Sequence, residues 1–343
     1  MSSPGPRGRR RRPRRTAVHL SVAAALLVTG SLAGTAYVTA RDRSAAPPGA
    51  VSSSAPSAES AAAGTAPAGR SEAGGADAEA ADGDGDEEER ETAEVDLDGA
   101  LARSLDSVAA GTDASLAVGL LDLETGAGAS YGTDGERTYD TASIVKVDVL
   151  AALLLRAQEE GRELTAQERA CASAMIRNSD NASTTTLWQV IGGADGLDAA
   201  NERLGLSGTT AGRNDNWGLT RTTAADQLTL LSAVFADGGD GGSGGSSGSV
   251  LSEESRAYVG ELMGGVAAGQ DWGVSAAGSG ARLKNGWLPR TATGLWDINS
   301  IGFVTVGGHR CLLAVLSEGH TTKEEGIALV EAAAKAAAGV VSG

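Results

Sequence analysis

A break in composition near residue 95 limits the part of the chain that can fold around a core. By length alone, 343 residues would suggest about two domains. Residues 41–95, however, are rich in Ala, Gly, Ser, Pro, Asp and Glu, and such a segment cannot bury enough apolar surface to offset the entropy lost on ordering. We therefore predict a disordered linker over 41–95, whose acidic part self-repels and extends. One domain of roughly 245 residues remains over 96–343, enough for a well-buried core.

The N-terminal end has the pattern of a targeting segment. Residues 1–16 contain the sequence RGRRRRPRR, which predicts a basic cytoplasmic region. The apolar run Ala17–Val38 follows and is long enough to span a bilayer, for which about 20 residues are needed. It leads into Val38-Thr39-Ala40, a small-residue pattern that a signal peptidase can accept. Residues 17–40 are thus predicted to be a signal anchor or a signal peptide, and the domain is expected to be membrane-anchored outside the cell or secreted.

Charge and metal-binding residue types exclude several function classes. The formal net charge is −16, and residues 1–43 hold nine Arg against one Asp. The folded part therefore lacks a basic footprint for nucleic acid, and membrane contact is expected through the N-terminal segment only. The two cysteines, Cys171 and Cys311, and the three His residues do not have metal-ligand spacing, so no metal and no cofactor are predicted. Whether the cysteines pair stays open.

Hydrophobic periodicity predicts a layered α+β domain after residue 95. Leucines 97, 101 and 105 recur at helical spacing, and 115–123 and 127–131 are predicted as strands joined by a turn. Helices are then predicted over 145–158, 165–177, 182–191, 197–204, 222–235 and 252–266, a flexible loop over 237–249, strands over 281–285, 300–306 and 311–316, and a helix over 322–338. We expect the terminal helices on one face of an antiparallel sheet of about five strands, with an all-helical lobe inserted between the second and third strands.

Three short motifs occur in order along this domain. In Ser143-Ile144-Val145-Lys146, at a helix start, the spacing places hydroxyl and amine on one helix face. The amine can then take the serine's proton if burial or a nearby cation lowers its pKa. Ser179-Asp180-Asn181 lies between two predicted helices, and Lys284-Asn285-Gly286 lies on a predicted strand. Each motif is weak alone, since such residues also serve as surface pairs, helix caps and turns. The ordered set is much more specific.

This set resembles the S-x-x-K, S-D-N and K-T-G motifs of class A β-lactamases and penicillin-binding proteins. Residues 171–206 resemble the class A segment that holds S-D-N, and Val118–Gly126 resembles the family's first strand and turn. The resemblance spans about residues 95–340. It implies the family's serine-hydrolase fold, in which the active site lies between a sheet lobe and a helical lobe.

The resemblance implies four catalytic side chains. Ser143 would attack the carbonyl of a β-lactam or of a D-alanyl peptide, and Lys146 would accept its proton. Ser179 would relay a proton to the leaving nitrogen. Lys284 would supply positive charge to Ser179 and to a substrate carboxylate.

The resemblance also implies a set of substrate contacts. Asn181 would hydrogen-bond the substrate's side-chain amide and the lysine of the first motif. Asn285, Gly286 and Trp287 would contact the substrate along the strand. The backbone N–H groups of Ser143 and Trp287 would form the oxyanion hole, of which each donor typically contributes about 10²–10³ in rate.

Three departures from the family pattern affect function. The residue after the third-motif lysine is Asn285 rather than a hydroxyl residue, although an amide can still donate to a carboxylate. The stretch Thr209–Thr223 lacks the glutamate that activates the deacylating water in class A enzymes, and its one carboxylate, Asp215, fits a turn residue better. Only 36 positions separate Ser143 from Ser179, which is shorter than in class A enzymes, so a more open site is expected.

Three functions remain as alternatives. The chain is expected to be a monomeric β-lactamase-like enzyme that opens β-lactams or related amides through a Ser143 acyl-enzyme. The missing glutamate favours instead a D-alanyl-D-alanine carboxypeptidase or penicillin-binding protein that acts on peptidoglycan peptides. A non-catalytic binder of cell-wall fragments or β-lactams is the third alternative, against which the complete set of motif residues argues.

Overall fold

The computed structural model describes Met1 and residues 96–133, 137–236 and 249–342. The chain divides into two units, Met1–Gly85 and Asp86–Gly343, and every described residue except Met1 belongs to the second. Apart from Met1, the predicted basic region, signal segment and linker lie outside the described residues, as does the predicted loop up to residue 248. Over the ranges described, no helix is both long and apolar enough to cross a membrane.

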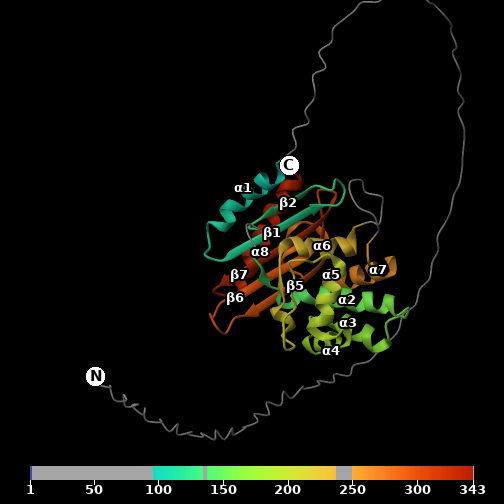
Figure 1. The fold of residues 1–343 in the computed structure, drawn as a ribbon. Coiled ribbons are helices and arrows are strands. Elements are labelled where there is room, and N and C mark those ends of the chain that lie inside the picture. The colour runs from blue at the N-terminus through green and yellow to red at the C-terminus, as the bar shows by residue number, and fades with distance from the viewer. Residues whose placement is uncertain (2–95, 134–136, 237–248, 343) are drawn as a thin grey trace, which may run out of the picture. The chain divides into compact units, whose positions relative to one another are not determined.

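A five-stranded antiparallel sheet forms the centre of the second unit (Figure 1). Its strands are β1 Ser115–Asp122, β2 Gly128–Tyr131, β5 Ser279–Pro289, β6 Trp296–Val306 and β7 His309–His320. They lie in the order β2-β1-β7-β6-β5, so β5 is an edge strand. The predicted fold class is confirmed. The last three strands are longer than predicted because pairing continues through glycine and polar residues of low strand propensity.

The two terminal helices, α1 Leu97–Ala109 and α8 Lys323–Ser342, cover one face of this sheet (Figure 1). Leu101 and Leu105 are fully buried there, as the helical spacing of the leucines predicted. The buried side of α8 is built mostly from alanines, whose small side chains let the helix lie close to the strands. This apolar layer fixes the sheet from behind.

The other face carries the helical lobe, which the chain enters after β2 and leaves at β5. Its helices are α2 Val145–Glu159, α3 Ala166–Arg177, α4 Asn181–Ile191, α5 Gly193–Leu204, α6 Ala224–Phe235 and α7 Glu253–Gly264. Helix α6 lies on the sheet, where a Cβ at Gly119 of β1 would come within 2.8 Å of Leu228. Helix α2 is buried on nearly all sides and therefore forms the lobe's centre.

A small second sheet, which the sequence did not predict, lies beside the start of α2. It pairs β3 Tyr139–Asp140 with β4 Arg221–Thr222. Two-residue strands give no periodic pattern, so tertiary contacts determine this pairing. Arg290 at the end of β5 forms an ion pair with the buried carboxylate of Asp140 and thereby joins the small sheet to the main one.

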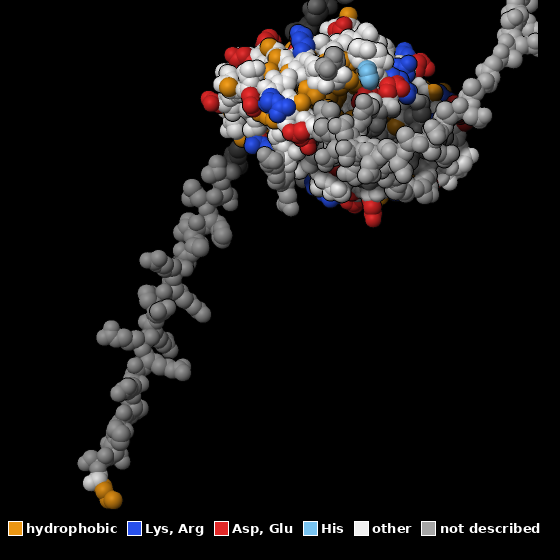
Figure 2. Space-filling view, turned by 90° about the horizontal axis from the view of Figure 1, so that it is seen from above, with side chains coloured by type: hydrophobic (Ala, Val, Ile, Leu, Met, Phe, Trp, Pro, Cys, Tyr) orange, Lys and Arg blue, Asp and Glu red, His pale blue; other side chains and the backbone are white. Residues whose placement is uncertain are grey.

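Surface ion pairs add little to the stability of this unit, and the two cysteines are not joined by a disulfide. Figure 2 shows acidic and basic side chains interspersed with hydrophobic ones on one face. Pairs such as Arg137–Glu318, at 2.9 Å, are partly exposed and so contribute little. Cys171 and Cys311 are both free thiols, which answers the question left open by the sequence.

Candidate active site

Ser143 lies in a short 3-10 helix, Ala142–Ile144, that leads directly into α2. The first residue of that helix has a φ of 49°, a strained value for a residue with a side chain and one that occurs at functional sites. Asn299 on β6 holds this turn, because its amide nitrogen donates to the carbonyl oxygens of Asp140 and Thr141 at 2.8 and 3.1 Å. The sheet therefore fixes the position of the predicted nucleophile.

Gly286 allows β5 to pass directly against the same turn. A Cβ on Gly286 would lie 2.7 Å from the carbonyl oxygen of Thr141 and 2.8 Å from the backbone nitrogen of Ser143. Contacts that short do not occur with a side chain present, so glycine is required here by the close approach. This contact brings the backbone nitrogen of Ser143 against β5 at Gly286, the residue before Trp287.

The amine of Lys146 is buried among four oxygen atoms. Its Nζ lies 3.0 Å from Ser143 Oγ, 3.0 Å from Ser179 Oγ, 2.7 Å from the Ser179 carbonyl oxygen and 2.8 Å from Asn181 Oδ1. Burial lowers the pKa of Lys146 from 10.5 to about 7, against the opposing effect of the Asp180 charge. Near neutral pH much of the amine is therefore unprotonated, and it can accept the proton of Ser143.

Ser179 is held in place by the beginning of α4. Its φ is 57°, again unusual outside glycine, and both its hydroxyl and its carbonyl oxygen contact Lys146. The next residue, Asp180, caps α4 by accepting a hydrogen bond from the backbone nitrogen of Ser183 at 2.7 Å. The cap and the strained turn together explain why Ser179 and Asn181 reach the same amine.

Lys284 on β5 approaches this hydroxyl from the sheet. Its Nζ lies 3.1 Å from Ser179 Oγ and 2.8 Å from the carbonyl oxygen of Asn285. Burial and then the charge of Lys146 hold the pKa of Lys284 well below its usual value. A site with two buried amines around one hydroxyl is suited to moving a proton through that hydroxyl.

The side chain of Asn285 is turned to backbone partners. Its amide nitrogen donates to the carbonyl oxygens of Gln270 and Trp272, both at 2.9 Å, so both amide hydrogens are used. Its Oδ1 is buried without a hydrogen-bond partner. In this structure Asn285 fastens the segment before β5 to the strand, and its donation to a substrate carboxylate stays a prediction.

A cleft of about 280 Å³ opens at Ser143. Ser143 and Asn181 line it together with Trp287 and Leu288 of β5, and residues 215–219 form a further wall. All eight predicted site residues thus lie in this region, although the amide nitrogen of Asn285 donates to backbone partners. Below the cleft surface, Lys146 contacts the hydroxyl groups of both Ser143 and Ser179. Lys284 contacts the hydroxyl group of Ser179.

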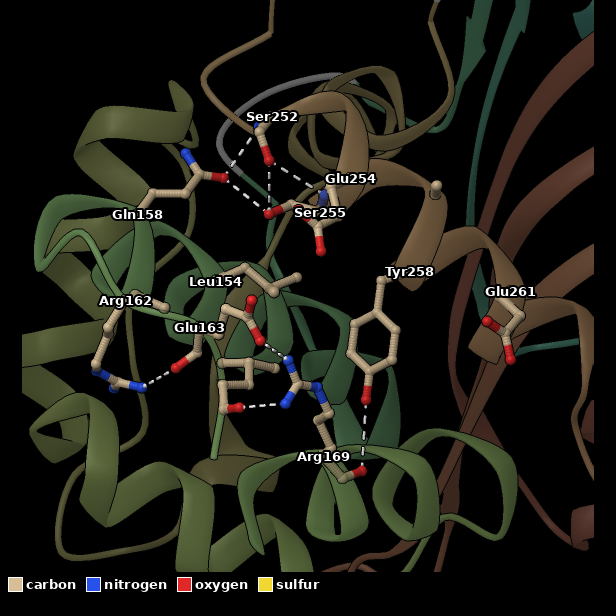
Figure 3. A pocket seen from close by; sticks show the side chains of 13 residues that line it. Leu154, Gln158, Arg162, Glu163, Arg169, Ser252, Glu254, Ser255, Tyr258 and Glu261 are labelled. Atoms are coloured by element: carbon tan, nitrogen blue, oxygen red, sulfur yellow. Dashed lines mark hydrogen bonds and ion pairs between the residues drawn. The ribbon is translucent and has the colours of Figure 1, made fainter. Parts of the chain in front are cut away.

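A second cavity, of about 370 Å³, lies between the end of α2, the start of α3 and α7 (Figure 3). Its polar side chains pair with one another: Ser255 donates to Gln158 at 2.9 Å, and Arg169 contacts Glu163 at 2.8 Å. None of the three motifs lines it. We therefore assign the chemistry to the smaller cleft at Ser143.

The stretch 209–223, which lacks the glutamate of class A enzymes, contributes residues 215–219 to the cleft wall. Asp215 lines the cleft, has a φ of 59°, and accepts a hydrogen bond from the indole nitrogen of Trp188 at 3.2 Å. Trp217 lies in the 3-10 helix Trp217–Leu219, with its ring centroid 5.0 Å from Lys146 Nζ. Sequence reasoning did not single out Trp217; the one signal was a large aromatic residue inside a polar loop.

Metal-ligating side chains do not gather in this site. Within residues 96–133, 137–236 and 249–342, no group of three or more His, Cys, Asp or Glu side chains is arranged to hold a metal ion. The side chains that hydrogen-bond to Lys146 and Ser179 are lysine, serine and asparagine, whose chemistry is proton transfer and hydrogen bonding.

Comparison with known proteins gives a family and a fold. A model described as the beta-lactamase enzyme family matches residues 163–341, slightly more than half of the chain. The match includes the second and third motifs, whereas Ser143 and Lys146 precede it. No curated protein sequence matches significantly.

Solved structures share the fold at low sequence identity. A class A beta-lactamase from Bacteroides cellulosilyticus is 16% identical with a TM-score of 0.60, over 72% of this chain and 98% of that one. A beta-lactamase from Xanthomonas campestris is 21% identical with a TM-score of 0.59, over 71% and 98%. A variant of PBP-A, solved as an acyl-enzyme complex with penicillin G, is 19% identical with a TM-score of 0.57, over 71% and 95%. At these sequence identities, the similarities are evidence for the fold alone.

Proposed function

The chain belongs to the beta-lactamase enzyme family, and from this premise we propose that it is a serine hydrolase that opens β-lactams through an acyl-enzyme on Ser143. One observation carries the proposal: Lys146 Nζ lies 3.0 Å from Ser143 Oγ with a pKa lowered to about 7. A serine becomes an effective nucleophile when a neighbouring base takes its proton, and a buried neutral amine is such a base.

In the acylation step, Lys146 takes the Ser143 proton while Ser143 Oγ attacks the carbonyl carbon. The backbone N–H groups of Ser143 and Trp287 stabilise the negative charge that develops on the carbonyl oxygen. Ser179, hydrogen-bonded to both lysines, gives its proton to the leaving nitrogen and takes from Lys146 the proton that came from Ser143. Breaking of the carbon–nitrogen bond then leaves an ester on Ser143.

Release of the acyl group is expected to be slow. The wall 209–223 contains no glutamate, and its carboxylate at Asp215 already accepts a hydrogen bond from Trp188. A positioned base commonly contributes about 10²–10⁴ in rate, so its lack lengthens the life of the ester. The fold neighbour PBP-A is recorded, in a variant form, as an acyl-enzyme with penicillin G, which supports the same state here.

The missing glutamate also supports a second function, that of a D-alanyl peptidase acting on peptidoglycan. Such an enzyme forms the same ester and passes the acyl group to water or to an amine. The two functions are separated by incubating the chain with penicillin G or with a D-alanyl-D-alanine peptide and measuring which substrate is consumed repeatedly.

The nucleophile is tested by intact-protein mass measured over time after penicillin G is added to the full chain. We expect one added penicillin mass on the wild type, none on Ser143→Ala, and slow addition on Lys146→Ala. Ser207→Ala, which removes an exposed serine outside the cleft, is the matched control and should react like the wild type. An adduct that persists in Ser143→Ala would show that another residue is the nucleophile.

We also propose that residues 44–343 are exported, because an arginine cluster precedes the apolar run Ala17–Val38. A reporter that is active only outside the cytoplasm, fused after Gly343, should then be active. Activity from a cytoplasm-only reporter at the same position would contradict export.

A further inference from the structure

The indole ring of Trp217 lies against the amine of Lys146 at the cleft. The ring centroid is 5.0 Å from Lys146 Nζ, and Trp217 is a half-buried residue of the cleft wall. The other neighbours of the amine are the oxygen atoms of Ser143, Ser179 and Asn181. Lys146 itself has no exposed surface. The ring therefore covers a side of the amine that the hydrogen-bonding oxygen atoms do not enclose.

Two hydrogen bonds to α4 hold this wall in place. The indole nitrogen of Trp217 donates to Thr185 Oγ1 at 3.3 Å, and Asp215 accepts from Trp188 at 3.2 Å. Asn214 and Asp215 both have positive φ values, 54° and 59°, a backbone conformation that glycine adopts more easily than residues with a side chain. Such strain persists only where the surrounding structure imposes it. Because the indole N–H is used on α4, the ring offers no hydrogen-bonding atom to water at Lys146.

Hydrolysis of an ester on Ser143 needs water next to a base. A water molecule must lie within hydrogen-bond reach of a proton acceptor while it contacts the ester carbon. After acylation, Lys146 is the buried amine beside the ester oxygen, and in its neutral form it can accept a proton. The face of the amine not enclosed by oxygen atoms is covered by an apolar ring.

On the basis of the proposed function, we propose that Trp217 sets the lifetime of the Ser143 acyl-enzyme by keeping hydrolytic water away from Lys146 Nζ. Trp217 acts through Lys146 and is thus a positioning residue. The step it suppresses is simple: water oxygen bonds to the ester carbon, and its proton passes to Lys146. The bond from that carbon to Ser143 Oγ then breaks, Oγ takes the proton back, and a carboxylic acid leaves.

The test compares Trp217→Ala with Trp217→Phe in the full chain, with penicillin G as the probe. Intact mass gives the rate at which the adduct forms and, after removal of free penicillin, the rate at which it is lost. Trp217→Ala should lose the adduct about 10²-fold faster than the wild type, the low end of the contribution of a base that water can reach. Trp217→Phe keeps a ring over the amine and should release at nearly the wild-type rate.

A pH profile distinguishes this role from a loosened fold. In Trp217→Ala, adduct loss should accelerate with rising pH as Lys146 becomes neutral, and because water now reaches the amine the rise should lie at or above the wild-type pKa of about 7. Trp217→Ser, which removes the ring and leaves a small polar side chain, should also release faster and serves if Trp217→Ala does not fold. If the adduct forms in these variants but is lost at the wild-type rate, the inference about Trp217 is overturned, whereas the proposed function still stands. Absence of any adduct on the wild type overturns the proposed function, and this inference with it.

Discussion

Lys146 and Lys284 both reach the hydroxyl of Ser179, at 3.0 and 3.1 Å. Two ammonium groups at these distances would repel each other in a buried site, so protonation of one disfavours protonation of the other. Burial acts in the same direction on both pKa values. The shared hydroxyl therefore lies between two amines whose pKa values are both lowered, that of Lys146 to about 7, an arrangement suited to proton transfer.

The first prediction follows from the pKa of Lys146. The amine accepts a proton only when neutral, and its pKa is lowered to about 7. The rate of acylation by penicillin G should therefore rise with pH, by about tenfold per unit well below 7, and level off above it. Lys146→Arg, whose side chain stays protonated, should acylate slowly at every pH. A wild-type rate that is constant from pH 5 to 8 would contradict Lys146 as the base.

The second prediction concerns the close approach at Gly286. Gly286→Ala places a methyl group 2.7 Å from the carbonyl oxygen of Thr141 and 2.8 Å from the Ser143 nitrogen, so β5 must move away from the nucleophile. Displacement of an oxyanion-hole donor should reduce acylation by about 10²-fold. The matched control is Gly339→Ala on α8, where a Cβ meets nothing within 4 Å. It should leave acylation unchanged; equal loss in both variants would show a general effect on folding.

The third prediction separates structure from substrate binding at Asn285. Asn285→Ala leaves the carbonyl oxygens of Gln270 and Trp272 without their donors, which costs about 1–3 kcal/mol for each buried group left unsatisfied. The melting temperature should fall clearly. Asn285→Asp, which keeps the size but loses the donating nitrogen, should also be destabilised. A variant that melts like the wild type but binds carboxylate ligands weakly would instead indicate a direct substrate contact.

Much of the fold was predictable because long elements leave periodic signals. The leucine spacing of α1 and the apolar run of β1 predicted their positions within a residue or two. The small sheet β3–β4 gave no signal, because two-residue strands are too short for any period. The ends of β5, β6 and β7 were missed because strand pairing, rather than local composition, extends them.

The site was predictable in its motif residues and unpredictable in its long-range contacts. Spacing on one helix brings Ser143 and Lys146 together, whereas their contact with Lys284 depends on how the sheet meets the helical lobe. Asn285 illustrates the limit: its residue type permits donation to a substrate, but the nearby segment 270–272 takes both amide hydrogens. Trp217 likewise becomes informative only when its ring is located beside Lys146.

The last prediction concerns Asp148, a carboxyl group buried in α2 with only 1% of its surface exposed. Burial raises its pKa to about 8; the amide nitrogen of Asn201, at 2.8 and 3.1 Å from the two oxygens, opposes this, and the Asp226 charge adds to it. Because the folded-state pKa lies above the unfolded value of 3.8, the folded state binds a proton more tightly. The stability from this group is full below the unfolded pKa and is lost as the pH rises through the folded one.

The melting temperature of the wild type should accordingly fall between pH 5 and pH 8 by more than that of Asp148→Asn, which cannot ionise. For a domain of this size each kcal/mol corresponds to about 2–4 °C, so the difference is measurable. The matched control is Asp106→Asn, which changes an exposed aspartate of α1 and should keep the wild-type pH dependence. If Asp148→Asn lost as many degrees as the wild type over this range, the carboxyl group would be ionised throughout, and the pH dependence would have to arise elsewhere in the core.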